Sequence, residues 1–138
     1  MHQLHIALNV QDLEKSIAFY RDVFDLAPDK KTPTYARFSV PNPGLVLTLN
    51  TKTKVRSGER VSHLGVRLEA DGTLDGFRTR MRSAGLVDKE EDQVLCCHAI
   101  QDKVWIRDPD GNHWEFYELL EDLDPEAPVT EGPARGCC

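Results

Sequence analysis

The stretch VSHLGVRLEA, residues 61–70, repeats the pattern with which the chain begins. Residues 4–10 read LHIALNV and residues 62–68 read SHLGVRL, so each run has a histidine at its second position. Both runs are typical of β-strands, and each is followed by a turn and a segment with helical periodicity. A period of about sixty residues predicts two copies of one supersecondary unit. His5 and His63 would then occupy equivalent positions that the symmetry brings together.

The composition is that of one ordinary globular domain. The chain has 138 residues, of which 40% are hydrophobic and 29% charged, and this length suffices for a buried core. The net charge is −6 and no lysine or arginine cluster stands out, which disfavours a nucleic-acid or anionic-membrane partner. The apolar runs are too short to cross a bilayer, and the first residues lack a signal-peptide pattern. We therefore expect a cytoplasmic protein.

Helix and turn signals divide the two halves in the same way. Asp12 is a suitable N-cap for a helix that carries apolar residues at helical spacing up to Phe24, and Thr73 and Gly85 bound a second helix. The expected strands are 4–10, about 34–40 and 45–50 in the first half, and 62–68, about 94–98, 103–107 and 113–119 in the second. With one further strand in the first half, the predicted fold class is α+β: two βαβββ modules that form an open curved sheet around a metal site.

These elements predict a single domain over residues 1–120. Module one spans residues 1–54 and module two spans residues 61–120. Residues 121–138 are acidic and then rich in proline and glycine, so they are predicted to form a flexible C-terminal tail. The repeat fits modules that close on each other within one chain or swap between subunits, which leaves both a monomer and a homodimer open.

Parity along the strands predicts a metal site. In each opening strand the large apolar residues share one face, which suits helix packing, and His5 and His63 lie on the other. In the last strand Glu115 lies on the face opposite to Trp114 and Phe116, and so has the same polar parity. Two imidazoles and one carboxylate form the facial triad suited to Fe(II), which Mn(II), Zn(II) and Co(II) can also occupy.

A fourth protein ligand is not expected. Aligning the Pro-Gly turn at 43–44 with the Asp-Gly turn at 110–111 places Thr48 at the position equivalent to Glu115. Since this residue is not a carboxylate, the repeat argues for three protein ligands and open coordination positions. Open positions are typical of a catalytic metal.

The four cysteines form two adjacent pairs, Cys96-Cys97 and Cys137-Cys138. Neighbouring side chains point apart in extended backbone, so this pattern is poor material for a disulfide framework. In a reducing compartment, paired thiols are typical of metal or redox chemistry, and they offer two soft donors. A buried thiol pair that packs as a small hydrophobe is the alternative interpretation.

Over residues 1–120 these features resemble the vicinal oxygen chelate superfamily, which includes glyoxalase I, extradiol dioxygenases and fosfomycin-resistance enzymes. The paired modules, the strand histidines and the closing segment DPDGNHWEFY, residues 108–117, carry the likeness. A closer likeness is to the ArsI-type C–As lyases and the CadI-type cadmium-induced proteins. It rests on Cys96-Cys97, on DKVW at residues 102–105 and on the segment 108–115.

The resemblance implies an Fe(II)-dependent dioxygenase that cleaves the C–As bond of trivalent organoarsenicals, methyl or aromatic, and releases arsenite. It assigns the iron to His5, His63 and Glu115 and the arsenic to Cys96 and Cys97. Dioxygen would be the second substrate. Lys103 is a candidate contact for an acidic group of the organoarsenical, with a solvated surface position as the alternative.

Two other functions stay open. A metal-dependent thiol transferase of the fosfomycin-resistance type also uses three ligands, but it would leave the vicinal thiols unexplained. A non-enzymatic protein that binds cadmium or arsenite would need only the four thiols. Cys137 and Cys138 either belong to a disordered tail or help to gather the metalloid.

Overall fold

Two copies of a βαβββ unit build one eight-stranded sheet with the strand order β2-β3-β4-β1-β5-β8-β7-β6. The computed structural model describes residues 2–41, 44–96, 98–107, 109 and 111–125. Module one consists of β1 (Gln3–Val10), α1 (Leu13–Phe24), β2 (Lys30–Thr32), β3 (Tyr35–Val40) and β4 (Leu45–Thr51). After a short 3-10 helix (Ser57–Glu59), module two consists of β5 (Val61–Leu68), α2 (Thr73–Ser83), β6 (Val87–Cys96), β7 (Ala99–Arg107) and β8 (His113–Asp122).

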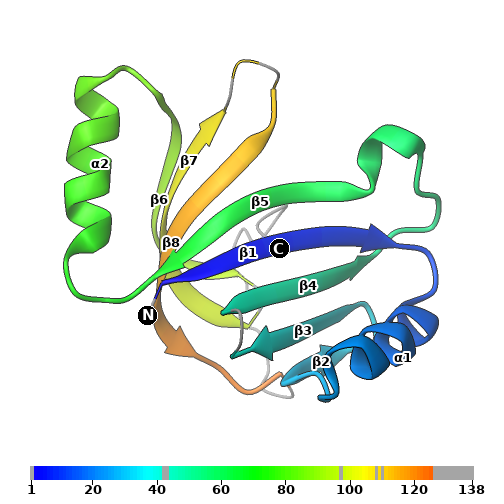
Figure 1. Cartoon of the computed structure of the whole chain (residues 1–138). Helices are drawn as coiled ribbons and strands as arrows, with labels where there is room; N and C mark the ends of the chain where they lie inside the picture. The colour runs from blue at the N-terminus through cyan, green and yellow to red at the C-terminus, as the bar shows by residue number, and fades with distance from the viewer. Residues whose placement is uncertain (1, 42–43, 97, 108, 110, 126–138) are drawn as a thin grey trace.

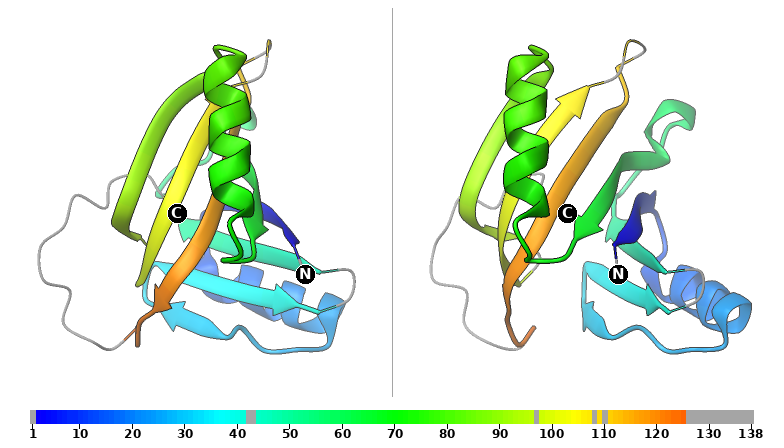
Figure 2. Two further views of the ribbon diagram at one scale, coloured as in Figure 1. Left: turned by 90° about the vertical axis from the view of Figure 1, so that its left-hand side faces the viewer. Right: turned by 60° about the vertical axis from the view of Figure 1, so that its left-hand side comes forward.

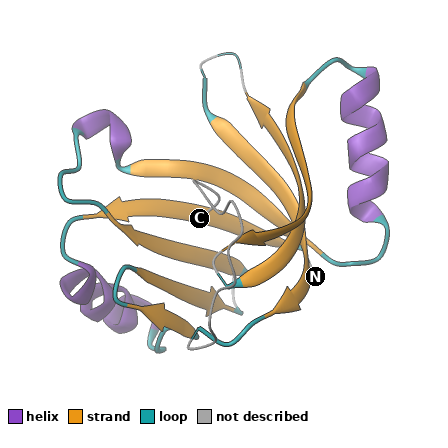
Figure 3. Cartoon of the chain, turned by 180° about the vertical axis from the view of Figure 1, so that it is seen from behind, coloured by secondary structure: helices purple, strands orange, loops and turns teal. Residues whose placement is uncertain are grey.

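The two modules have the same internal topology. In each module the first strand lies parallel to the last, β1 beside β4 and β5 beside β8, and the two first strands join the modules as an antiparallel pair. Figure 1 shows the two helices on opposite outer sides of the molecule. Figures 2 and 3 show how steeply the two four-stranded halves are turned against each other. The predicted pair of βαβββ modules is confirmed, and the seam between them runs along the two histidine strands.

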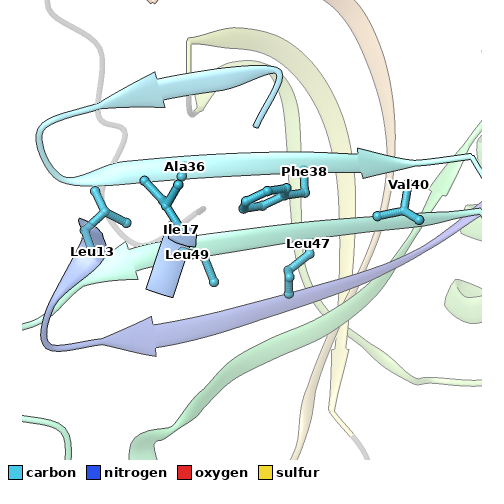
Figure 4. Packing of buried hydrophobic residues seen from close by; sticks show 7 residues of the cluster. All are labelled: Leu13, Ile17, Ala36, Phe38, Val40, Leu47 and Leu49. Atoms are coloured by element: carbon cyan, nitrogen blue, oxygen red, sulfur yellow. The ribbon is translucent and has the colours of Figure 1, made fainter. Parts of the chain in front are cut away.

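Each helix covers the outer face of its own half-sheet. The cluster beneath α1, drawn in Figure 4, consists of Leu13, Ile17, Ala36, Phe38, Val40, Leu47 and Leu49. The cluster beneath α2 consists of Leu68, Leu74, Phe77 and Val104. Because side chains alternate along a strand, packing one parity outward against a helix turns the other parity inward. The histidine parity therefore faces the concave side of the curled sheet.

The helix boundaries agree with the sequence except at one cap. Asp12 caps α1, because its carboxylate accepts a hydrogen bond from the backbone N–H of Lys15 at 3.1 Å. The predicted cap of α2 is wrong: Gly72 holds the N-cap position, and Thr73 is the first helical residue. Gly85 follows the end of α2 with a φ of +69°, a left-handed conformation that glycine adopts without steric cost.

Three strands of module two are longer in the structure than the sequence suggested. Strand β6 already begins at Val87, and β8 continues to Asp122, past the predicted domain end at residue 120. Residues 126–138, with Cys137 and Cys138, lie outside the described residues, as does Cys97. In the described part of the chain, no helix is both long and apolar enough to cross a membrane.

Candidate metal centre

The three predicted metal ligands meet at the seam between the modules. His5 of β1 lies opposite Gly65 of β5 in the antiparallel pair, and Gly65 lies beside Glu115 of β8 in the parallel pair. His63 is two residues before Gly65, on the same face of β5. Because Gly65 has no side chain, the groups on the strands at either side of it can meet above its backbone. A Cβ at this position would lie 2.6 Å from the carbonyl oxygen of Glu115 and 2.7 Å from its Cγ.

The geometry of the three side chains fits a metal ion. Glu115 Oε1 lies 3.3 Å from His5 Nδ1 and 3.3 Å from His63 Nε2. One ligand atom from each residue lies within 4.8 Å of the others. Metal bonds of about 2.1 Å place neighbouring ligand atoms about 3.0–3.4 Å apart for angles between octahedral and tetrahedral.

Two polar atoms of this cluster make no hydrogen bond with good geometry among the described residues. They are His63 Nε2 and Glu115 Oε1, which are buried and contact each other at 3.3 Å. Buried polar groups are costly when their hydrogen bonds are unmet, and a cation bound by both atoms would compensate them. On the other side of the His63 ring, Nδ1 lies 3.1 Å from the hydroxyl of Ser62. A proton on Nδ1, donated to that hydroxyl, leaves the Nε2 lone pair for a metal.

The electrostatics favour a charged glutamate and neutral imidazole at His5. Lys103 donates from Nζ to Glu115 Oε2 at 2.9 Å, and each of the two side chains is only 1% exposed. Burial by itself would raise the pKa of Glu115, but Lys103 and the two histidines outweigh it and lower this pKa to about 2. Burial lowers the pKa of His5 to about 4, against the opposing attraction of Glu115. Both side chains are thus in the protonation state that binds a cation.

Hydroxyl groups complete the surroundings of His5. Tyr117 Oη lies 2.7 Å from Nδ1, and Thr48 Oγ1 lies 3.3 Å from Nε2. Metal binding at His5 would therefore replace one of these two hydrogen bonds. Burial also raises the pKa of Tyr117 well above its ordinary value, so its phenol stays protonated.

The register supports three protein ligands rather than four. Thr48 lies beside Ala7 in module one as Glu115 lies beside Gly65 in module two. The repeat therefore places Thr48 where a second carboxylate would stand, as the sequence alignment of the two turns predicted. Its hydroxyl bonds to His5 instead.

Three cavities adjoin the triad. The inner cavity has a volume of only about 20 Å³ and is lined by His5, Glu115, Arg37 and Gln101, among others. Two outer cavities, of about 300 Å³ and about 510 Å³, both reach His63. The triad therefore lies between a nearly filled interior and two larger pockets.

Cys96, the last residue of β6, lies opposite Ala99 of β7. Side chains of opposed residues share a face, and Ala99 has the same parity as Gln101 and Lys103, so Cys96 belongs to the face that carries Glu115. The side-chain amide of Gln101 donates to the carbonyl of Cys96 at 3.3 Å. Cys96 is fully buried and disulfide-bonded, so the expectation of free thiols is wrong for this residue in the structure.

Lys103 has a different place from the one the sequence suggested. The alternative of a solvated surface position is wrong, because the residue is buried and its ammonium group binds Glu115; the contact to an acidic group of the substrate stays a prediction. The sequence reasoning also missed the close approach of Glu115 to Gly65, although a glycine inside a strand is a recognised signal that another part of the chain approaches its backbone. Tyr117 shares the parity of Glu115, but nothing in the sequence places its hydroxyl at His5.

The family model described as the Glyoxalase/Bleomycin resistance protein/Dioxygenase superfamily matches residues 2–116. The trivalent organoarsenical cleaving enzyme of Bacillus sp. (strain MD1) is 42% identical over 139 residues, which cover 100% of this chain and 83% of the relative. Cadmium-induced protein CadI of Mycobacterium bovis (strain ATCC BAA-935 / AF2122/97) is 37% identical over 144 residues, which cover 100% of this chain and 93% of the relative.

Among solved structures, the Mn(II)-bound glyoxalase from Novosphingobium aromaticivorans is similar, with a TM-score of 0.64 at 18% identity. The match covers 95% of this chain and 44% of that chain. At this identity the likeness concerns the fold alone.

Proposed function

The chain belongs to the glyoxalase/bleomycin resistance protein/dioxygenase superfamily, and from this premise we propose that it is an Fe(II)-dependent dioxygenase that cleaves the C–As bond of trivalent organoarsenicals. Methylated and aromatic arsenicals are the substrate class, and arsenite is the released product. The observation that carries the proposal is the buried cluster of His5, His63 and Glu115, whose ligand atoms lie within 4.8 Å of one another on the same sheet face as Cys96. The names of the similar organoarsenical cleaving enzymes supply the substrate.

His5, His63 and Glu115 would hold the iron. Bound Fe(II) supplies open coordination positions and the redox chemistry that dioxygen needs. Lys103 keeps Glu115 ionised and holds its second oxygen, so that Oε1 is directed at the metal position. The strand backbone supports all three ligands, which keeps the ligand set rigid.

Cys96 and Cys97 would bind arsenic as thiolates, since sulfur is a soft donor and trivalent arsenic a soft acceptor. The disulfide at Cys96 has to be reduced first, because only the reduced sulfur can bind. The cytoplasm keeps thiols reduced and is therefore the compartment in which we place the reaction. Holding the arsenical on the same sheet face as the metal ligands would bring its carbon toward the reacting centre.

The stoichiometry can be tested with the smallest substrate. Methylarsenite, CH3As(OH)2, and dioxygen together contain the atoms of arsenous acid and formaldehyde, so this conversion needs no further reductant. The experiment is to purify and reduce the protein without oxygen, load Fe(II), add methylarsenite and then admit air. We expect arsenite, formaldehyde and consumed dioxygen in equal amounts.

Two variants separate the metal site from the thiol site. We expect Cys96→Ser to lose arsenical affinity while it keeps iron, and His63→Ala to lose iron while it keeps arsenical affinity. Full activity of the Cys96→Ser protein would show that the thiol has no role. Both affinities can be measured by calorimetry on reduced protein.

A soft-metal binding protein is the second candidate, because of the similarity to cadmium-induced CadI. Such a protein would bind arsenite or cadmium through its thiols and turn over nothing. Tight arsenical binding without arsenite release in the experiment above would favour this candidate over the enzyme.

A further inference from the structure

A buried lysine far from the metal ligands in sequence links module one to the turn that follows Cys96. Lys30 begins the short strand β2, yet its side chain is only 3% exposed. Its Nζ donates to the backbone carbonyl of His98, at 3.0 Å, and also binds the carboxylate of Asp122. None of the roles proposed above uses this lysine.

The carbonyl that Lys30 binds belongs to a strained turn. His98 lies in the connection between β6 and β7, and its φ is +58°, a left-handed conformation that is uncommon outside glycine. Such a conformation costs free energy and persists where surrounding contacts impose it. The same carbonyl accepts a second hydrogen bond from the backbone N–H of Leu123 at 2.8 Å.

A second basic side chain, Arg37, also binds Asp122, the carboxylate partner of Lys30. Arg37 of β3 donates to Asp122 at 3.0 Å and to Asp29 at 2.6 Å, and its guanidinium is itself largely buried. Asp122 is therefore held by two basic side chains of module one. Arg37 also lines the inner cavity beside His5. One network thus runs from the cavity wall to the turn after Cys96.

We propose that Lys30 is a positioning residue for arsenical capture: from module one it anchors the β6–β7 turn and so holds Cys96 on the face of the metal ligands. This inference rests on the proposed function. The anchor crosses between modules, which explains why a lysine is buried at the edge of the sheet. Removing the Lys30 ammonium group leaves every metal ligand in place but allows the turn to leave its strained conformation. Arsenical binding would then have to restore that conformation of the turn.

The test compares Lys30→Met with Lys31→Met in reduced protein. Methionine keeps the length of the side chain, and Lys31 is the adjacent lysine on the same strand, half-exposed and paired with Glu14. We expect Lys30→Met to weaken the affinity for methylarsenite about tenfold, the size of a lost hydrogen bond to a charged group. Fe(II) affinity should stay within about twofold of wild type, because the ligands are untouched. Lys31→Met should change neither affinity.

A second measurement does not depend on arsenic chemistry. The rate at which iodoacetamide alkylates reduced Cys96, followed by mass spectrometry, reports how firmly the turn is held. We expect faster alkylation in Lys30→Met and a smaller increase in Asp122→Asn, which keeps the shape of the partner. Equal rates in Lys30→Met and Lys31→Met would overturn the anchor. If wild-type protein binds no arsenical, the proposed function fails, and the alkylation rates still decide whether Lys30 holds the turn.

Discussion

Replacing Gly65 by alanine tests whether the missing side chain at this position of β5 is what allows the metal site to form. The added Cβ would lie 2.6 Å from the carbonyl oxygen of Glu115, about 0.8 Å inside the 3.4 Å at which ordinary contact begins. The atoms in the way are the backbone and Cγ of Glu115, not the far end of a flexible side chain. Strand β8 therefore has to move away from β5, and Glu115 moves with it.

The size of this displacement sets the expected effect. Metal bonds tolerate about 0.2 Å, and Oε1 of Glu115 lies only 3.3 Å from its histidine neighbours, so a shift of several tenths of an ångström distorts the ligand set. We expect metal affinity to fall about 10–100-fold, or about 1.4–2.8 kcal/mol. Overpacking should also lower the free energy of unfolding by about 1–3 kcal/mol.

The assay is chelator competition for Fe(II) or Mn(II), with urea denaturation of the metal-free protein alongside. Gly76→Ala is the matched control, because no atom outside the helix backbone lies within 4 Å of its Cβ and alanine favours a helix interior. It should stabilise the protein by about 0.5–1 kcal/mol and leave metal affinity unchanged. A folded Gly65→Ala protein with wild-type metal affinity would refute the reasoning.

Three further predictions concern charges around the site. Lys103→Met leaves the buried Glu115 carboxylate unpaired and should cost the metal-free protein about 3–5 kcal/mol in urea denaturation, with a smaller loss once a metal supplies positive charge. Thr48→Glu adds a carboxylate at the position of module one that is equivalent to Glu115. It should tighten metal binding about tenfold and slow turnover. Weaker metal binding in chelator competition would contradict the symmetry argument. Asp122→Asn should make stability depend less on pH in the acid range. Burial raises the pKa of Asp122, but hydrogen bonds from two basic side chains lower it below its ordinary 3.8. The carboxylate therefore contributes stability above that pH, which is lost as the pH falls through the folded-state pKa, and circular dichroism against pH would measure the loss.

The meeting of His5, His63 and Glu115 could be predicted because strand parity is a strong constraint. A one-residue slip would turn His5, His63 and Glu115 outward, and the helix-facing apolar residues of the same strands prevent such a slip. The internal repeat then paired the two histidine strands and identified Thr48 as the counterpart of Glu115. The register of the sheet agrees with that alignment.

The features that the sequence could not supply depend on contacts between strands that are distant in the chain. Lys103 gives no periodic signal of its own, and its burial follows only from the pairing of β7 with β8. Strand β2 has three residues, too few to show alternation. The ion pair between Lys30 and Asp122 joins residues 92 positions apart, and no local sequence pattern can predict such a contact.

One of the proposed ligands comes from module one and two come from module two, so a bound ion would cross-link the halves of the chain. His5 belongs to β1, whereas His63 and Glu115 belong to strands of the second repeat. Free metal at a hundred times its dissociation constant would add about 2.7 kcal/mol to the stability of the assembled fold. A cell deprived of that metal would therefore lose the protein as well as its activity, because the unclamped halves separate more readily and become substrates for proteases.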